Sequence, residues 1–166
     1  SDVCSSDLER RFHYWRAQSA ARKLADDPAW LDGVLTGTDL IHLSGITLAI
    51  IAPDKRQTLK AALGQARASG ARICLDPNIR PALWQGPDEA RDVIADFMGI
   101  ADIALPSFDD ERGLWDDATP AETCQRYHRL GVAEVVVKDG SKAVTCMAKG
   151  EMIQFPTPPA RAVRDT

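Results

Sequence analysis

Segments typical of strands alternate with segments typical of helices along most of this chain. Short β-branched and apolar runs are followed by stretches whose apolar residues recur three and four positions apart, as on one face of a helix. The expected strands are residues 39–44, 72–76, 101–105 and 134–138, and the expected helices are 53–69, 87–98, 107–114 and 119–130. The strand at 39–44 is expected to be buried, and the β-branched strand at 134–138 to be buried on both faces. Such repeated alternation implies right-handed crossovers and a mostly parallel sheet covered by helices on both faces, an α/β fold.

Capping residues and turns refine these boundaries. Asp27-Pro28 and Thr119-Pro120 each place an N-cap residue before a proline at the first helical position. After the last parallel strand, residues 143–148 and 152–155 are expected to pair antiparallel through a turn at Lys149-Gly150. The sheet should therefore end in a hairpin.

The first residues follow a different pattern. Residues 1–8 are small and polar without periodicity, and we expect a disordered or foreign tail before the domain at 9–166. Residues 10–16 are rich in aromatic side chains, as in an exposed or edge strand. Tyr14 and Arg16 would share one face of that strand, where a phenol and a guanidinium could bind a carboxylate. Ordinary aromatic packing on an edge strand is the alternative.

The composition fits one globular domain that works in the cytoplasm. The chain has 166 residues, of which 45% are hydrophobic and 27% charged, and its scattered basic residues leave a net charge of −4, so no nucleic-acid surface is expected. The longest apolar stretch, 40–52, is far shorter than the ~20 residues that a membrane span requires. The N-terminus lacks the pattern of a signal peptide and the cysteines form no C-x-x-C pair, which favours reduced thiols.

Polar residues collect where the predicted parallel strands end, which is where ligands bind in such sheets. These positions are Ser44-Gly45, Asp76 to Arg80, Pro106-Ser107 and Lys138 to Gly140. Arg80, in a loop stiffened by two prolines, suits an anionic ligand. Alternatively, Asp76 caps the following turn and Arg80 pairs with a surface carboxylate. Asp139-Gly140 fits either a nucleotide-binding loop or a simple turn.

Several other kinds of site find no support in the sequence. His13, His42 and His128 are not spaced as metal ligands, so no metal site held by the protein is expected. No Ser-His-Asp arrangement can be read from such dispersed residues. Neither G-x-G-x-x-G nor the P-loop pattern occurs, which disfavours dinucleotide-binding dehydrogenases and P-loop enzymes.

Six segments resemble, in the same order, segments of the ribokinase-like (PfkB-type) sugar kinases. They are FHYWRAQSA, DLIHLSGITLA, ICLDPNIRPALW, ADIALPSFDDE, VVVKDGSKA and the terminal VRDT. Within the family the resemblance is strongest to the kinases of 2-keto-3-deoxygluconate. It implies a three-layer α/β/α domain with a β-sheet lid, of which residues 9–18 would be a remnant. It also implies ATP and Mg²⁺ as cofactors and transfer of the γ-phosphoryl group to a sugar hydroxyl, a reaction that depends on positioning and electrostatics.

The resemblance also implies roles for individual residues. Those at the substrate would be Tyr14, Arg16, Ser44, Gly45 and Arg80, and those at the nucleotide would be Ser107, Glu111, Lys138 and Gly140. Ser107, which is Asn in many relatives, and Glu111 would lie near the phosphates and the water shell of magnesium. Two guanidiniums facing one ligand favour an acidic sugar over fructose or ribose.

The last two residues match the start of the family signature D-T-x-G-A-G-D. Asp165 and Thr166 hold its first two positions, so the rest of the anion hole and the catalytic base would lie beyond Thr166. We therefore expect an internal part of a kinase, without most of the lid and the C-terminal part, that has no measurable activity by itself. Its partners would be a sugar acid and ATP, with no nucleic acid or membrane; homo-oligomer formation is left open. The alternatives are a kinase for another sugar, such as fructose or a nucleoside, and a non-catalytic remnant.

Overall fold

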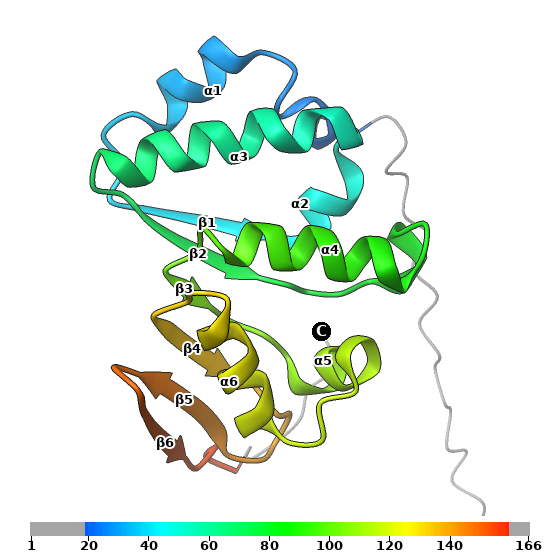
Figure 1. Cartoon of the computed structure of the whole chain (residues 1–166), viewed down its shortest axis with the longest axis vertical. Coiled ribbons are helices and arrows are strands. Elements are labelled where there is room, and N and C mark those ends of the chain that lie inside the picture. The colour runs from blue at the N-terminus through cyan, green and yellow to red at the C-terminus, as the bar shows by residue number, and fades with distance from the viewer. Residues whose placement is uncertain (1–18, 160–166) are drawn as a thin grey trace, which may run out of the picture.

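The computed structural model describes residues 19–159, which form one six-stranded sheet with helices packed against it (Figure 1). The strands follow one another across the sheet in chain order. The first four are parallel and the last two are antiparallel, which confirms the predicted mostly parallel α/β class and the terminal hairpin. The strands are β1 (Leu40–Ser44), β2 (Arg72–Asp76), β3 (Ile103–Ala104), β4 (Glu134–Val137), β5 (Val144–Ala148) and β6 (Glu151–Phe155).

Helices connect the strands within this range, and their starts follow from the sequence. They are η1 (Ala20–Lys23), α1 (Pro28–Leu35), α2 (Gly45–Ile50), α3 (Pro53–Ala68), η2 (Pro81–Leu83), α4 (Pro87–Met98), α5 (Phe108–Trp115) and α6 (Pro120–Arg129), where η marks a 3₁₀ helix. The predicted caps are confirmed: the Asp27 side chain accepts a hydrogen bond from the Trp30 N–H at 3.1 Å, and Thr119 accepts one from the Glu122 N–H at 3.3 Å. Proline at the first position suits α1, α3, α4 and α6 because the first turn leaves that N–H unused.

The hydrophobic core lies between the sheet and the helices. The predicted apolar face of α3 is buried at positions 59, 62, 63 and 66. It belongs to one cluster with Ile73 and Leu75 of β2 and with Ile94 and Phe97 of α4. Each of these four side chains is at most 2% exposed. This packing fixes the strands, and with them the loops at their carboxyl ends.

Three elements differ from the sequence expectation. β1 lies at the edge of the described sheet, so only Leu43 of its residues is buried, and Leu40 is 56% exposed. Residues 45–50 form the short helix α2, which the sequence prediction missed within the apolar run. β4 was expected to be buried on both faces, and this is wrong: Val135 and Val137 are buried, whereas Val136 is half-buried. The reason is that α6 packs against one face of this strand.

The hairpin at the end of the sheet forms as predicted. Lys149 and Gly150 have φ angles of +53° and +77°, as a two-residue hairpin turn with both central residues in the left-handed region requires. Every residue of β6 is exposed.

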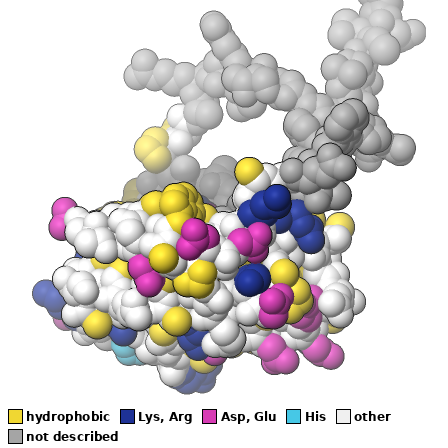
Figure 2. Space-filling model, turned by 90° about the horizontal axis from the view of Figure 1, so that it is seen from above, with side chains coloured by type: hydrophobic (Ala, Val, Ile, Leu, Met, Phe, Trp, Pro, Cys, Tyr) yellow, Lys and Arg dark blue, Asp and Glu magenta, His cyan; other side chains and the backbone are white. Residues whose placement is uncertain are grey.

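Charges of both signs are mixed on the surface that Figure 2 shows. Lys and Arg side chains lie there beside Asp and Glu side chains and form no continuous basic area on this face. Across residues 19–159, no helix is long and apolar enough to cross a membrane.

Candidate functional site

The four parallel strands end at the same edge of the sheet, and polar residues follow each of them. The registers pair Ser44 with Asp76 and Leu75 with Ala104, so the ends of β1, β2 and β3 are level. Ser107 forms a parallel bridge with Lys138, which brings the segments after β3 and β4 together as well. The structure therefore gathers Ser44, Asp76, Ser107 and Lys138 at one edge, as the strand-end rule predicts.

Gly45 lets the loops after β1 and β2 come into direct contact. A Cβ atom on Gly45 would lie 1.9 Å from the Pro77 carbonyl oxygen, a distance that no side chain allows. Beside this contact, the Ser44 hydroxyl accepts hydrogen bonds from the Ile46 N–H at 3.3 Å and from Asn78 Nδ2 at 3.5 Å. Ser44 and Gly45 thus form one wall with the loop that leads to Arg80.

Asp76 takes part in both its own turn and the loop after β4. Its Oδ1 accepts a hydrogen bond from the Asn78 N–H at 3.0 Å, which is the turn-capping arrangement considered as an alternative above. Its Oδ2 accepts one from Lys138 Nζ at 2.8 Å. Asn78 has a φ angle of +37°, a conformation that Asn adopts more readily than most residues.

Arg80 lies at this edge beside a carboxylate that the sequence prediction missed. Its Nη1 donates to the Ile79 carbonyl at 2.9 Å and lies 3.5 Å from Asp110 Oδ2, so it does pair with a carboxylate. The Arg80 side chain is nevertheless 51% exposed, so it can reach a ligand. Burial raises the pKa of Asp110, and the nearby Arg80 guanidinium opposes that rise.

Glu111, predicted to lie at the nucleotide, is instead buried between α5 and α6. It is 0% exposed, and its Oε2 accepts hydrogen bonds of 2.7 Å from both Tyr127 Oη and Arg126 Nη2. The Arg126 guanidinium also binds Asp117 at 2.6 Å. Glu111 belongs to a buried polar network in which, among the described residues, its Oε2 is hydrogen-bonded and its Oε1 is not. The acidic side chain that α5 presents at the strand ends is therefore Asp110.

Helical spacing is the signal that would have separated these two acidic residues. Phe108, Glu111 and Leu114 recur every three positions and are all buried, so they share the core-facing side of α5. Asp110 falls between them in the sequence and therefore points elsewhere. Asp110 and Arg80 are thirty residues apart in the sequence, so their contact is visible only in the folded structure.

The buried position of Glu111 makes the stability of the chain depend on pH. Loss of hydration raises the pKa of Glu111 to about 7, although Tyr127 and Arg126 stabilise its charged form. The folded chain keeps a proton that the unfolded chain releases above about pH 4.5. This contribution to stability is therefore complete below about pH 4.5, declines as the pH rises, and is lost above about pH 7.

We expect Glu111→Gln to remove this pH dependence, because glutamine cannot ionise. Relative to the parent chain, the free energy of unfolding of the variant should rise by about 3 kcal/mol between pH 4.5 and pH 8, measured by urea unfolding. Glu151→Gln, at an exposed position on β6, is the control. A difference between variant and parent that stays constant over this range would contradict a raised pKa.

The segment after β4 is tied to the start of α5. The Lys138 N–H donates to the Pro106 carbonyl at 2.9 Å, and the Phe108 N–H donates to the Lys138 carbonyl at 2.8 Å. The Ser107 side chain makes no capping hydrogen bond to α5. Gly140 has a φ of +55° in a turn that the Lys142 N–H closes on the Asp139 carbonyl, which is the simple-turn alternative.

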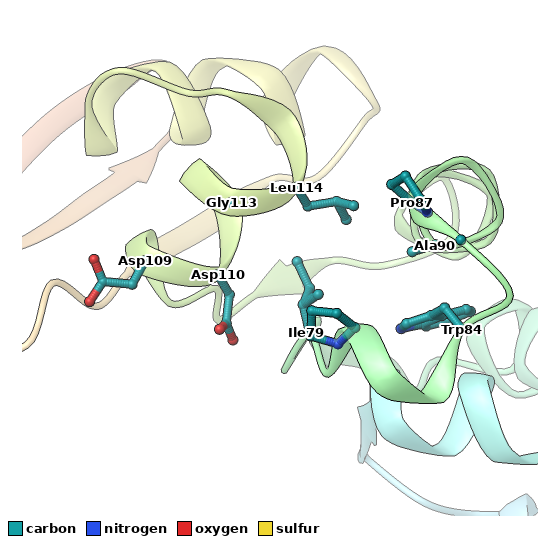
Figure 3. Close-up of a pocket in the computed structure, with 10 residues that line it drawn as sticks. Ile79, Trp84, Pro87, Ala90, Asp109, Asp110, Gly113 and Leu114 are labelled. Atoms are coloured by element: carbon teal, nitrogen blue, oxygen red, sulfur yellow. The ribbon is translucent and has the colours of Figure 1, made fainter.

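An apolar cavity of about 270 Å³ lies next to this edge (Figure 3). Ile79, Trp84, Pro87 and Leu114 surround it, with Asp110 at one side. The charged groups of the cavity are the carboxylates of Asp109 and Asp110, and among residues 19–159 no Arg or Lys side chain lines it to pair with an anionic ligand. The strand ends, with their hydroxyl, amide and charged groups, are therefore the better candidate site. Tyr14, Arg16, Asp165 and Thr166 lie outside the described residues, as do the predicted tail and lid remnant.

Comparison with known proteins identifies relatives over most of the chain. The family described as pfkB family carbohydrate kinase matches residues 3–166. A 2-dehydro-3-deoxygluconokinase of Haemophilus influenzae is 41% identical over 134 residues, covering 80% of this chain and 43% of the relative. One of Dickeya dadantii is 39% identical over 147 residues, covering 87% and 47%. The chain thus spans about half the length of these curated relatives.

Solved structures agree with the sequence relatives. The crystal structure of a PfkB protein from Polaromonas sp. JS666 superposes with a TM-score of 0.75 at 32% identity, over 89% of this chain and 49% of that one. A putative Ribokinase II from E. coli, in complex with ATP and Mg²⁺, gives a TM-score of 0.65 at 26% identity, over 80% and 42%. The described sheet and helices therefore correspond to part of a larger known fold.

Proposed function

The chain belongs to the pfkB family of carbohydrate kinases, and from this we propose that the protein containing it phosphorylates 2-keto-3-deoxygluconate with ATP. 2-Dehydro-3-deoxygluconate, in the names of the Haemophilus and Dickeya relatives, is the same sugar acid. The observation that carries the choice of an acid is Arg80, a half-exposed guanidinium at the ligand-binding edge of the sheet. A guanidinium pairs with a carboxylate through two parallel, charge-assisted hydrogen bonds, whereas a neutral sugar offers only uncharged hydroxyl groups.

On this proposal, some of the loops at the strand ends bind the sugar acid and the others bind the nucleotide. Arg80 would bind the carboxylate of the sugar acid, beside the wall of Ser44 and Gly45. Arg16 would add a second guanidinium and Tyr14 a phenol, both from outside the described residues. Lys138 and the loop at Gly140 would border the nucleotide. The Ser107 hydroxyl, which makes no capping hydrogen bond to α5, would lie nearby.

ATP would supply the phosphoryl group, and Mg²⁺ would neutralise part of the negative charge on its phosphates. Asp110 fits the cation better than Glu111 does, because its carboxylate lies at the strand ends and Glu111 is enclosed by Arg126 and Tyr127. Among residues 19–159 no cluster of three or more metal-ligating side chains is present. Magnesium would therefore enter with the nucleotide and meet this chain mainly through its water shell. Asp165 and Thr166 would open the anion-hole loop.

We place this reaction in the cytoplasm. Cys74, Cys124 and Cys146 are free thiols in the structure, as reducing conditions would keep them.

The proposal is tested with the protein encoded by the complete reading frame. Phosphorylation of 2-keto-3-deoxygluconate, fructose and ribose is measured with ATP in a coupled ADP-release assay. We expect kcat/KM for the acid to exceed that for either neutral sugar by about 100-fold, which corresponds to about 2.7 kcal/mol of differential binding. A preference for fructose would make the protein a neutral-sugar kinase, and turnover of none of the three would contradict the proposed function.

A further inference from the structure

An ion pair joins the ends of two strands that are not neighbours. Asp76 ends β2 and Lys138 follows β4, and their side chains meet at 2.8 Å across the end of β3. β3 has only two residues, so the pair lies over the short strand at the ligand-binding edge. The ammonium group is thus held between the loop that carries Arg80 and the turn at Gly140.

Hydrogen bonds to backbone groups hold the Asp76 carboxylate and the main chain of Lys138 in place. The Asn78 N–H holds the second oxygen of the Asp76 carboxylate at 3.0 Å. The backbone of Lys138 is bonded on both sides, to Pro106 and to Phe108. The flexible part is the lysine side chain, which is 45% exposed and has four rotatable carbon–carbon bonds. Without a partner it would sample many rotamers, so the Asp76 carboxylate is what restricts it to one place.

The opposite ends of the same strands carry a comparable pair. Arg72 at the start of β2 binds Glu134 at the start of β4 at 2.9 Å, again across β3. Both of these side chains are about half-exposed. Both pairs thus join β2 to β4 across β3, although Asp76 is less exposed, at 20%, than the members of the other pair. Only the pair of Asp76 and Lys138 lies at the candidate site.

We propose that Asp76 is a positioning residue that holds the Lys138 ammonium at the place where the phosphoryl group is transferred. This inference rests on the proposed kinase function. The Asp76 carboxylate repels the negative charge of ATP, so it does not strengthen nucleotide binding. Its Oδ1 also holds the turn at Asn78, a hydrogen bond that asparagine can keep, so Asp76→Asn removes chiefly the contact with Lys138. A loss of lysine orientation lowers kcat without raising the KM for ATP.

The kinetic test compares three variants of the protein encoded by the complete reading frame. Asp76→Asn should lower kcat at least about 10-fold and leave the KM for ATP unchanged or lower. Lys138→Met should lower kcat and also raise the KM for ATP, because it removes the positive charge itself. Glu134→Gln breaks the pair of Arg72 with Glu134 at the opposite ends of the same strands, and it should change neither kcat nor the KM for ATP. If Asp76→Asn and Glu134→Gln behave alike, the inference is overturned.

A second measurement reads the position of the lysine directly and does not depend on turnover. In the protein encoded by the complete reading frame, labelled with ¹⁵N at the lysine side-chain nitrogen, NMR relaxation reports how ordered the Lys138 ammonium is. Order that is present in the parent and in Glu134→Gln, and lost in Asp76→Asn, supports the inference; order that survives in Asp76→Asn contradicts it. A parent protein that turns over none of the sugars overturns the proposed function, and with it the role in transfer, even where the lysine proves to be ordered by Asp76.

Discussion

Replacing Arg80 by alanine is expected to raise the KM for 2-keto-3-deoxygluconate about 100-fold and to leave the KM for ATP unchanged. The side chain is half-exposed in the loop after β2, and within residues 19–159 its ion-pair partner is Asp110 at 3.5 Å, which leaves donors free for a ligand. Truncating one partner of a hydrogen-bonded charge pair costs about 2–5 kcal/mol, and each 1.4 kcal/mol is a factor of about ten in affinity. Steady-state kinetics with each substrate varied in turn measures both constants.

Two further variants make this result specific to the guanidinium. Arg80→Lys keeps the positive charge but loses the planar fork, so it should recover only part of the affinity for the acid. Arg112→Ala removes an arginine of α5 that is 59% exposed and pairs with Asp109, and it should leave both KM values unchanged. An unchanged KM for the acid in Arg80→Ala, or an equal rise in both constants, would mean that Arg80 does not bind the acid.

Gly45→Ala is expected to destabilise the chain by about 3 kcal/mol or more. The added Cβ would lie 1.9 Å from the Pro77 carbonyl oxygen and 2.8 Å from its carbonyl carbon, so a backbone segment would have to move. Gly45 and Pro77 lie in two loops of the candidate site, so the same shift would displace the loop that carries Arg80. Urea unfolding of the 166-residue chain measures the effect.

Gly64→Ala is the matched control for this substitution. Gly64 lies within α3, and nothing lies within 4 Å of the position of its Cβ. Alanine has the higher helix propensity, so this variant should be more stable than the parent by up to about 1 kcal/mol. Equal unfolding midpoints for Gly45→Ala and the parent would show that the two loops do not touch.

Local patterns predicted most of the fold, because the signals for these elements lie within a few residues of them. The helix at 87–98 has the expected bounds, and the caps at Asp27 and Thr119 form as their side chains predict. The exposure of β1 could not be predicted in the same way. Whether an apolar strand is central or at an edge depends on which other strands pair with it, and that is a property of the whole sheet.

The candidate site was predicted as a set of loops but not as a set of contacts. The strand-end rule selected loops that the structure does bring together, since the carboxyl ends of parallel strands share one edge. The contact of Gly45 with Pro77 and the pair of Asp76 with Lys138 join residues that are far apart in the sequence, so no local pattern contains them. Glu111 shows the opposite case, because helical spacing within α5 already places it on the buried side.

The measurement that tests the central claim most directly is a crystal structure of the protein encoded by the complete reading frame, with 2-keto-3-deoxygluconate and a non-hydrolysable ATP analogue bound. The account predicts that the sugar carboxylate lies within hydrogen-bonding distance of Arg80, and that the triphosphate lies at the end of β4, beside Lys138 and Ser107. A sugar acid bound in the apolar cavity beside Trp84, or with its carboxylate turned away from Arg80, would contradict it.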